Sequence, residues 1–269
     1  MRSTNTWVYR LCLALTLGLL LFGAIELISW QVERARLRRV AEAVAGPALG
    51  EVERLTRLTG WVYRNKGYKR NRRYHLWRKL GATPTSVLEH GGSCQDKSKL
   101  LLVLLRELDV PSSLAMLYQC QGCKPRHTVV IAETRDGWTI ADPAFDITFP
   151  DGRGGLHTIE ELRADRTILE RRLAELRAER GPADPINDYK RAVDHHALMT
   201  TVNWDKNALT RGAAGLIRAA GGEPWSTPRP IFLDDPRLFF ALFGFGGALA
   251  FSMLALLLYA RRSDMLAPL

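Results

Sequence analysis

Residues 83–110 read TPTSVLEHGGSCQDKSKLLLVLLRELDV, and this pattern predicts a buried helix that begins near Ser93. Residues 100–105 are apolar on every side of such a helix, which is typical of a central helix packed all round. Asp109, Val110 and Pro111 are expected to end it. The segment therefore predicts a helix at the centre of a folded domain.

Other short elements are predicted on both sides of this helix. Upstream, apolar residues from Glu51 onward have helical spacing, with a break at 81–84. Downstream, 113–118, 128–133 and 138–141 have the composition of strands. Two helices followed by a small antiparallel sheet make an α+β fold.

Cys94 lies where the central helix begins. A thiol at a helix N-terminus faces unpaired N–H groups and the positive end of the helix dipole, which favours the thiolate. Gly91 and Gly92 allow backbone or substrate to approach closely, and the Cys94 N–H could donate to an oxyanion. Taken alone, the pattern fits a structural cysteine as well as a nucleophile.

His127 and Asp142 are candidate partners for this cysteine. A thiolate nucleophile needs a base held by a carboxylate. His127 begins one predicted strand and Asp142 ends the next. A turn of even length between the strands would put both side chains on one face and within reach, whereas an odd turn without a bulge would separate them. The sequence therefore predicts Cys94, His127 and Asp142 as catalytic residues.

At this point the sequence resembles a known family. Residues 83–110, with RHTVVIAETRDGWTIADPAF at 126–145, resemble the core of the transglutaminase-like superfamily, whose fold is related to papain-like cysteine proteases. The resemblance covers 51–149 and rests on three motifs in order: Gly-Ser-Cys opening a Leu-rich helix, His opening a strand, and Asp-Pro closing the next strand.

The resemblance implies thiol acyl chemistry. Cys94 would be the nucleophile, His127 the general base and acid, and Asp142 the residue that orients the imidazole. The family includes proteases, transamidases, amidases and inactive scaffolds, so no single reaction follows. Many relatives have an aromatic pair after the His, where this chain has Thr-Val-Val at 128–130. Trp77 or Tyr74 could donate to the oxyanion by position, and neither is assigned.

Two long apolar runs predict membrane helices. Residues 11–30 are interrupted only by Glu26, and 238–260 contain no charge; each is long enough to cross a bilayer. A secretory signal peptide is the alternative for the first run, and an uncleaved anchor is preferred. Positively charged residues next to a membrane helix tend to stay in the cytoplasm, so the arginines at 34–39 favour a cytoplasmic position for the residues between the two helices, whereas those at 261–262 oppose it. The rule is weak for a loop of this length, because long loops are translocated largely regardless of their charge. We expect an integral protein of the inner or plasma membrane with an extracytoplasmic central domain.

The positive charge is concentrated in one segment. The net charge of +10 equals that of residues 31–80, which hold 14 Lys and Arg against 4 Asp and Glu. Aromatic side chains are interleaved with these cations. A solvated helical face is the simplest interpretation; an anionic lipid surface, an acidic polysaccharide or nucleic acid could also bind there. Nucleic acid is not expected as a partner.

The predicted organisation has six parts. With 46% hydrophobic and 25% charged residues, global disorder and collagen-like repeats are excluded. The first three are an N-terminal transmembrane anchor at 1–30, a basic helical segment leading into the core at 31–82, and a transglutaminase-like catalytic core at 83–150. The fourth is a charged helical extension at 151–220, which is expected to contain an amphipathic helix at 159–180 and a second helical stretch near 189–198. The last two are a proline-rich linker at 221–236 and a C-terminal transmembrane helix at 237–262.

The remaining cysteines and histidines leave alternatives open. Cys120 and Cys123 could form a tight disulfide, stay reduced, act in redox chemistry, or bind zinc with His127 and either Cys94 or His90. Cys12 is read as a small buried residue of the first span. His157, His195 and His196 are read as surface residues.

Taken together, the sequence predicts a membrane-anchored cysteine enzyme. It would form a thioester on Cys94 and hydrolyse or transfer an amide-linked acyl group from a protein or peptide near the membrane. Membrane lipids are the other expected partner, and no cofactor or metal is expected. The alternative from another class is a catalytically inactive, membrane-tethered scaffold or binding module with the same fold.

Overall fold

The computed structural model describes residues 2–46, 48–118, 123–191, 199–222, 227 and 229–264. The chain divides into two compact units. Met1–Arg34 and Phe232–Leu269 form the two-helix unit, and Ala35–Ile231 forms the central unit. Helix α1 (Arg2–Val44) contributes residues to both.

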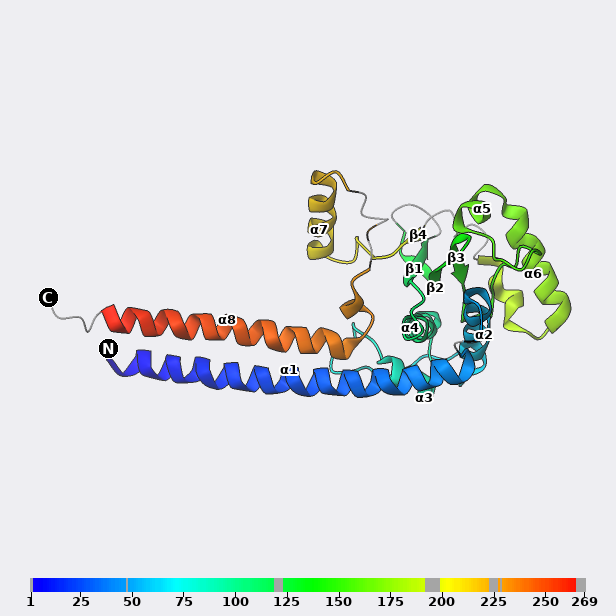
Figure 1. Cartoon of the computed structure of the whole chain (residues 1–269). Coiled ribbons are helices and arrows are strands. Elements are labelled where there is room, and N and C mark those ends of the chain that lie inside the picture. Colours follow the sequence, from blue (N-terminus) through cyan, green and yellow to red (C-terminus); the bar gives the residue numbers. More distant parts are fainter. Residues whose placement is uncertain are drawn as a thin grey trace. The chain divides into compact units, whose positions relative to one another are not determined.

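Two apolar helices make up the two-helix unit. Both α1 and α8 (Pro236–Asp264) are long and apolar enough to cross a membrane. They run side by side (Figure 1) and approach most closely at two glycines, where a Cβ on Gly244 would lie 2.8 Å from the Gly23 Cα. Small residues of this kind let apolar helices pack backbone to backbone.

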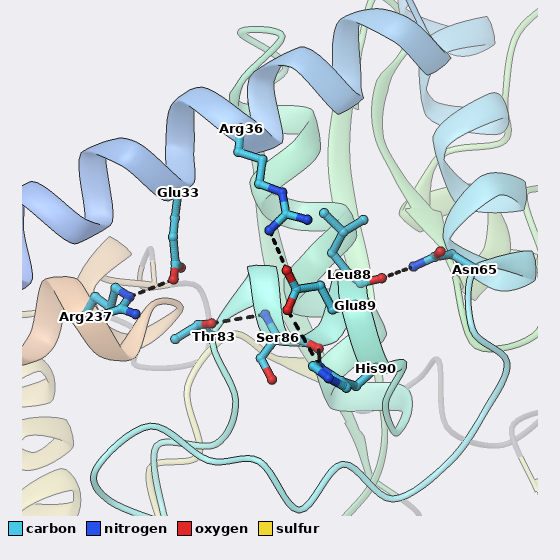
Figure 2. A network of polar contacts seen from close by, with 9 residues as sticks. All are labelled: Glu33, Arg36, Asn65, Thr83, Ser86, Leu88, Glu89, His90 and Arg237. Atoms are coloured by element: carbon cyan, nitrogen blue, oxygen red, sulfur yellow. Dashed lines mark hydrogen bonds and ion pairs between the residues drawn. The ribbon is translucent and has the colours of Figure 1, made fainter.

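Glu26 in the first apolar segment and Glu33 just after it are both paired with Arg237. Glu26 accepts from Arg237 Nη1 at 3.2 Å, and Glu33 accepts from Arg237 Nε at 2.7 Å (Figure 2). A charge in an apolar environment is tolerated when it is paired in this way. Helix α1 extends beyond the predicted anchor at 1–30; no glycine or proline occurs between 31 and 45, and the helix continues to Val44.

The central unit is an α+β fold. A four-stranded sheet has the order β3-β2-β1-β4 and antiparallel pairing throughout. Its strands are β1 (Ser112–Tyr118), β2 (Pro125–Thr134), β3 (Gly137–Ala141) and β4 (Met199–Thr200). Helix α4 (Cys94–Arg106) contacts β1 and β2, and residues 100–105 of it are buried, so the predicted central helix is confirmed (Figure 1).

The turn between β2 and β3 has even length. Val130 pairs with Ala141 and Thr134 pairs with Gly137, which leaves the two turn residues Arg135 and Asp136. Because the turn has an even number of residues, His127 and Asp142 lie on the same face of the sheet, as the sequence analysis required for a catalytic pair.

The basic residues after α2 (Glu51–Arg64) lie in an irregular loop and not on the expected helix. Residues 65–82, here called the basic loop, contain seven Lys and Arg and no Asp or Glu. Lys66 and Gly67 have positive φ values of 57° and 66°, which a helix does not allow. The buried Lys97 donates to the carbonyls of Val62 and Tyr63 at 2.7 and 2.8 Å and so satisfies the end of α2.

A short helix follows the basic loop. Helix α3 (Pro84–His90) was not anticipated, although Thr83 and Pro84 form a recognisable start: Thr83 Oγ1 accepts from the Ser86 N–H at 3.1 Å. Asn65, at the start of the basic loop, donates to the Leu88 carbonyl of α3 at 2.8 Å (Figure 2). The loop is therefore fastened to the helix that precedes α4.

Residues 159–180 form two helices where one was expected. Asp165 leaves helical geometry and separates α5 (Ile159–Ala164) from α6 (Arg166–Arg180), and its Oδ1 accepts from the Thr167 N–H at 2.9 Å. Asp165 therefore acts as an N-cap. Apolar residues of α6 join the core behind the sheet. The elements that follow are a 3₁₀ helix, η1 (Pro185–Arg191), then β4, α7 (Ala208–Ala219) and η3 (Ile231–Leu233).

Two expected segments are described only in part. Of the predicted helical stretch near 189–198, residues 189–191 belong to η1 and 192–198 lie outside the described residues. Of the predicted linker at 221–236, residues 223–226 and 228 lie outside them, and the rest includes η3 and the start of α8.

Candidate active site

Cys94 is the first residue of α4, as predicted. Ser93 precedes it, and its N–H and Oγ–H both donate to Asp96 Oδ2, at 3.0 and 2.8 Å. Gly91 has a φ of 74°, and a Cβ there would lie 2.8 Å from the Lys66 carbonyl oxygen. Only glycine fits this close approach. The Gly-Gly-Ser sequence thus presses the start of α4 against the basic loop.

His127 and Asp142 meet beside Cys94. His127 Nε2 donates to Asp142 Oδ2 at 2.6 Å, and both side chains are shielded, with 11% and 1% exposed. The Cys94 thiol and the His127 imidazole are hydrogen-bonded to each other. Because Nε2 is engaged by Asp142, Nδ1 is the ring nitrogen left for the thiol. The structure thus brings all three predicted residues together from α4, the start of β2 and the end of β3.

The electrostatics favour an ion pair between thiolate and imidazolium. Burial lowers the pKa of His127, but the charge of Asp142 and the hydrogen bond with it outweigh burial, and the Cys94 contacts add to them, so this pKa rises to about 10. Burial raises the pKa of Cys94, but the hydrogen bond and positive charge of His127 outweigh it and hold this pKa below its ordinary value. The lowered pKa of Cys94 favours its thiolate form.

Further contacts fix the geometry around the pair. Ser98 Oγ, one turn along α4 from Cys94, donates to the Thr128 carbonyl at 2.8 Å and ties α4 to β2 next to His127. The Thr128 N–H hydrogen-bonds Cys94 and contributes to its lowered pKa. Asp142 Oδ1 accepts from the Ala144 N–H at 2.9 Å, which orients the carboxylate.

Tyr68 is a site residue that the sequence analysis missed. Its hydroxyl lies within hydrogen-bonding reach of both the Cys94 thiol and the Cys94 N–H, and burial and the nearby thiol raise its pKa. Backbone contacts position it: Tyr68 forms a bridge with Gly92, and the Lys69 N–H donates to the Gly92 carbonyl at 3.1 Å. A donor at this point faces the place where an oxyanion would form.

The two positional candidates for this role lie elsewhere. Tyr74 lines a cavity beside the basic loop, and Trp77 stacks with the Lys79 ammonium, 5.8 Å from the ring centroid. The spacing of aromatic residues in the basic loop gave no reason to choose Tyr68, because its placement depends on the backbone bridge to Gly92.

An aromatic pair closes the site behind His127. Phe145 and Tyr189 are in edge contact with each other at 4.8 Å, and with the imidazole at 5.6 and 6.1 Å. The buried Tyr189 hydroxyl faces the Asp142 carboxylate without a well-formed hydrogen bond, and burial, followed by the charge of Asp142, raises its pKa well above the ordinary value. Tyr189 belongs to η1 in the extension, so residues beyond the predicted core complete the site.

The other cysteines and histidines are placed as follows. Cys123 is disulfide-bonded, so its sulfur is not a free zinc ligand, and Cys120 lies outside the described residues. Cys12 and Cys94 are free thiols, and Cys12 is buried. Within the described ranges no cluster of three or more His, Cys, Asp or Glu could hold a metal.

The remaining predicted histidines make local contacts. His90 Nδ1 contacts the Ser86 carbonyl at 3.0 Å (Figure 2). His157 is partly exposed and contacts Glu161 at 3.3 Å. His195 and His196 lie outside the described residues.

Comparison with known proteins agrees with this geometry. Residues 38–143 match the family model of the transglutaminase-like superfamily, and this part of the chain has a transglutaminase-like fold. The matched range contains Tyr68, Cys94, His127 and Asp142, whereas Tyr189 lies outside it. No curated protein matches the chain.

One solved structure is similar. It is described as that of "a Putative Cysteine Protease from Cytophaga hutchinsonii", with 20% sequence identity and a TM-score of 0.35. The match covers 43% of this chain and 39% of that chain. This chain therefore spans about two fifths of that protein's length.

Proposed function

We propose that this protein is a membrane-anchored, transglutaminase-like cysteine enzyme that forms a thioester on Cys94. It would cleave an amide bond of a protein or peptide and pass the acyl group to water or to an amine. The observation that carries the proposal is the contact of Cys94 at the start of α4 with a His127 that Asp142 holds at 2.6 Å.

In the first half-reaction the Cys94 thiolate attacks the carbonyl carbon of the amide. A C–S bond forms, and negative charge develops on the carbonyl oxygen, where the Cys94 N–H and the Tyr68 hydroxyl can donate to it. The His127 imidazolium then gives its Nδ1 proton to the leaving nitrogen, and the C–N bond breaks. An amine leaves and a thioester remains on Cys94.

In the second half-reaction water or an amine attacks the thioester carbonyl. Neutral His127 takes a proton from the attacking atom, the C–S bond breaks, and the thiolate and imidazolium are restored. Asp142 stabilises the imidazolium in both steps and stays ionised. The chemistry proposed here uses no cofactor.

The two apolar helices support an anchor in the inner or plasma membrane. Each is long enough to span the bilayer, which would keep the central unit close to membrane lipids and to substrates near the membrane. The disulfide at Cys123 supports an extracytoplasmic central unit, because disulfides persist in oxidising compartments. Alkylation of cells with a membrane-impermeant maleimide tests the side: labelling of Cys94 in intact cells is expected, and labelling only after lysis would contradict it.

The enzyme proposal is tested by the pH dependence of Cys94 alkylation. The detergent-solubilised full chain is treated with iodoacetamide, and the labelled peptides are quantified by mass spectrometry; the buried free thiol of Cys12 serves as an internal control. Cys94 should react well below the ordinary thiol pKa of about 8.5, and His127→Ala should abolish this advantage. An inert Cys94, or reactivity that ignores His127, would favour the inactive scaffold instead.

A further inference from the structure

A cavity lies beside the candidate active site and is lined by cationic side chains. Its volume is about 450 Å³, and Arg70, Arg72 and Arg78 contribute to its wall, together with Tyr74 and Asp96. All three arginines come from the basic loop, whereas Asp96 comes from the first turn of α4. Three arginines thus line a single space.

These arginines have no acidic partners in the described part of the chain. Arg70, Arg72 and Arg78 form no side-chain ion pair there, and the basic loop itself contains no Asp or Glu. The one carboxylate at the cavity, Asp96, accepts two hydrogen bonds from Ser93 through Oδ2 and is a single acidic group against three arginines. Like charges held together repel each other, and an anion in the cavity would relieve this repulsion.

The loop that carries the arginines is held at several points. Lys97 donates to the Asn65 carbonyl at 3.4 Å near one end, and Lys99 donates to the Leu80 carbonyl at 2.8 Å near the other. Between them, Asn71 Nδ2 donates to the Gly91 carbonyl at 3.0 Å. The arginines are therefore presented by an anchored backbone, which reduces the entropy lost when a ligand binds.

The cavity and the nucleophile share their supporting segments. Tyr68, whose hydroxyl reaches Cys94, is two residues from Arg70, and Asp96 is two residues from Cys94. Asn71, which also lines the cavity, donates to the Gly91 carbonyl at 3.0 Å, three residues before Cys94. The cavity is therefore built on the same segments of chain that carry Tyr68 and Cys94.

We propose that this cavity recognises an anionic group of the substrate, so that the enzyme selects acidic peptides. A carboxylate or phosphate on the substrate peptide would bind the guanidinium groups, which match both anions with paired N–H donors. The inference deepens the proposed function and rests on it. A peptide is favoured over a lipid headgroup because the cavity adjoins the segments that surround Cys94.

Binding is measured by fluorescence polarisation on the detergent-solubilised full chain. The probes are two labelled peptides of equal length, one with three glutamates and one with three glutamines. The acidic peptide should bind about tenfold or more tightly than the neutral one, and the preference should weaken as salt rises. Equal binding of the two peptides would overturn the proposal.

Matched variants locate the site. The triple variant R70Q/R72Q/R78Q should lose the preference, whereas R153Q/R171Q/R218Q removes the same charge from exposed arginines elsewhere and should keep it. An equal loss in both variants would indicate non-specific attraction and contradict the proposal. Tighter binding of soluble dihexanoyl phosphatidylglycerol than of the acidic peptide would assign the cavity to lipid instead.

A second readout connects the cavity to the nucleophile. The bound acidic peptide should slow Cys94 alkylation several-fold in the wild type and not in R70Q/R72Q/R78Q. Binding without protection of Cys94 would contradict a site for substrate. Peptide binding does not require a reactive thiol, so the two experiments give separate results. Equal binding of the acidic and neutral peptides would overturn only the inference about the cavity. A Cys94 alkylation rate that does not depend on His127 would overturn only the proposed enzyme function.

Discussion

Asp142→Asn tests whether the carboxylate holds the thiolate and imidazolium together. The charge of Asp142 is the largest effect that raises the pKa of His127 to about 10. Without that charge, the buried imidazole is expected to be largely neutral at pH 7 and above, since its ordinary pKa is about 6.5 and burial lowers it. The Cys94 thiol would then lose the positive charge that lowers its own pKa.

The expected magnitude follows from the ordinary thiol pKa. A thiol of pKa about 8.5 is about 3% ionised at pH 7, whereas His127 holds the pKa of the wild-type Cys94 below its ordinary value and so increases the thiolate fraction. The rate of iodoacetamide alkylation of Cys94 at pH 7 should therefore fall by up to about 30-fold in Asp142→Asn. The midpoint of its pH profile should move up to about 8.5 or beyond.

The assay follows Cys94 by peptide mass spectrometry between pH 5 and pH 10. Glu160→Gln, which removes an exposed carboxylate on α5, is the matched control and should leave the profile unchanged. Circular dichroism establishes that each variant is folded. A folded Asp142→Asn protein with the wild-type rate at pH 7 would refute the role assigned to the carboxylate.

Three further predictions test the supporting structure by thermal unfolding in detergent. Tyr189→Ala should lower the free energy of unfolding by about 3–5 kcal/mol, because it removes a buried aromatic ring. Tyr189→Phe removes only an unpaired buried hydroxyl and should lower it by less than about 1 kcal/mol. Equal losses of stability in the two variants would contradict the packing role of the ring. Lys97→Met should cost about 2–3 kcal/mol, because the carbonyls at the end of α2 lose their donor, and unchanged stability would show that they do not need it. Gly244→Ile should cost about 1–3 kcal/mol by overpacking against Gly23, whereas Gly246→Ile, which has open space, should be tolerated; similar effects would contradict the helix contact.

The meeting of Cys94, His127 and Asp142 was predictable because each of these residues lies at or beside the end of a regular element. A Gly-Gly-Ser sequence before a Leu-rich run marks the start of α4, and an even turn at 135–136 fixes the relative faces of His127 and Asp142. These signals are local or follow from strand register. They can therefore be recognised in the sequence without knowledge of the rest of the fold.

The missed features depend on long-range contacts. The end of α2 is set by Lys97, more than thirty residues further along the chain, and this contact leaves 65–82 outside any helix. Tyr68 reaches Cys94 only because its backbone bridges to Gly92. Tyr189 lies outside the segment that resembles the family, in a stretch without a clear periodic pattern. Local pattern does not encode such pairings.

The central claim is that Cys94 forms an acyl-enzyme with the help of His127, and trapping this intermediate tests it most directly. The full chain in detergent is mixed with p-nitrophenyl acetate at pH 7, quenched with acid, and digested for mass spectrometry, with hydroxylamine treatment to identify a thioester. The account predicts rapid, hydroxylamine-sensitive acetylation of Cys94 that is strongly reduced in His127→Ala and absent from Cys12. Acetylation of Cys94 no faster than that of Cys12, or equal in His127→Ala, would contradict it.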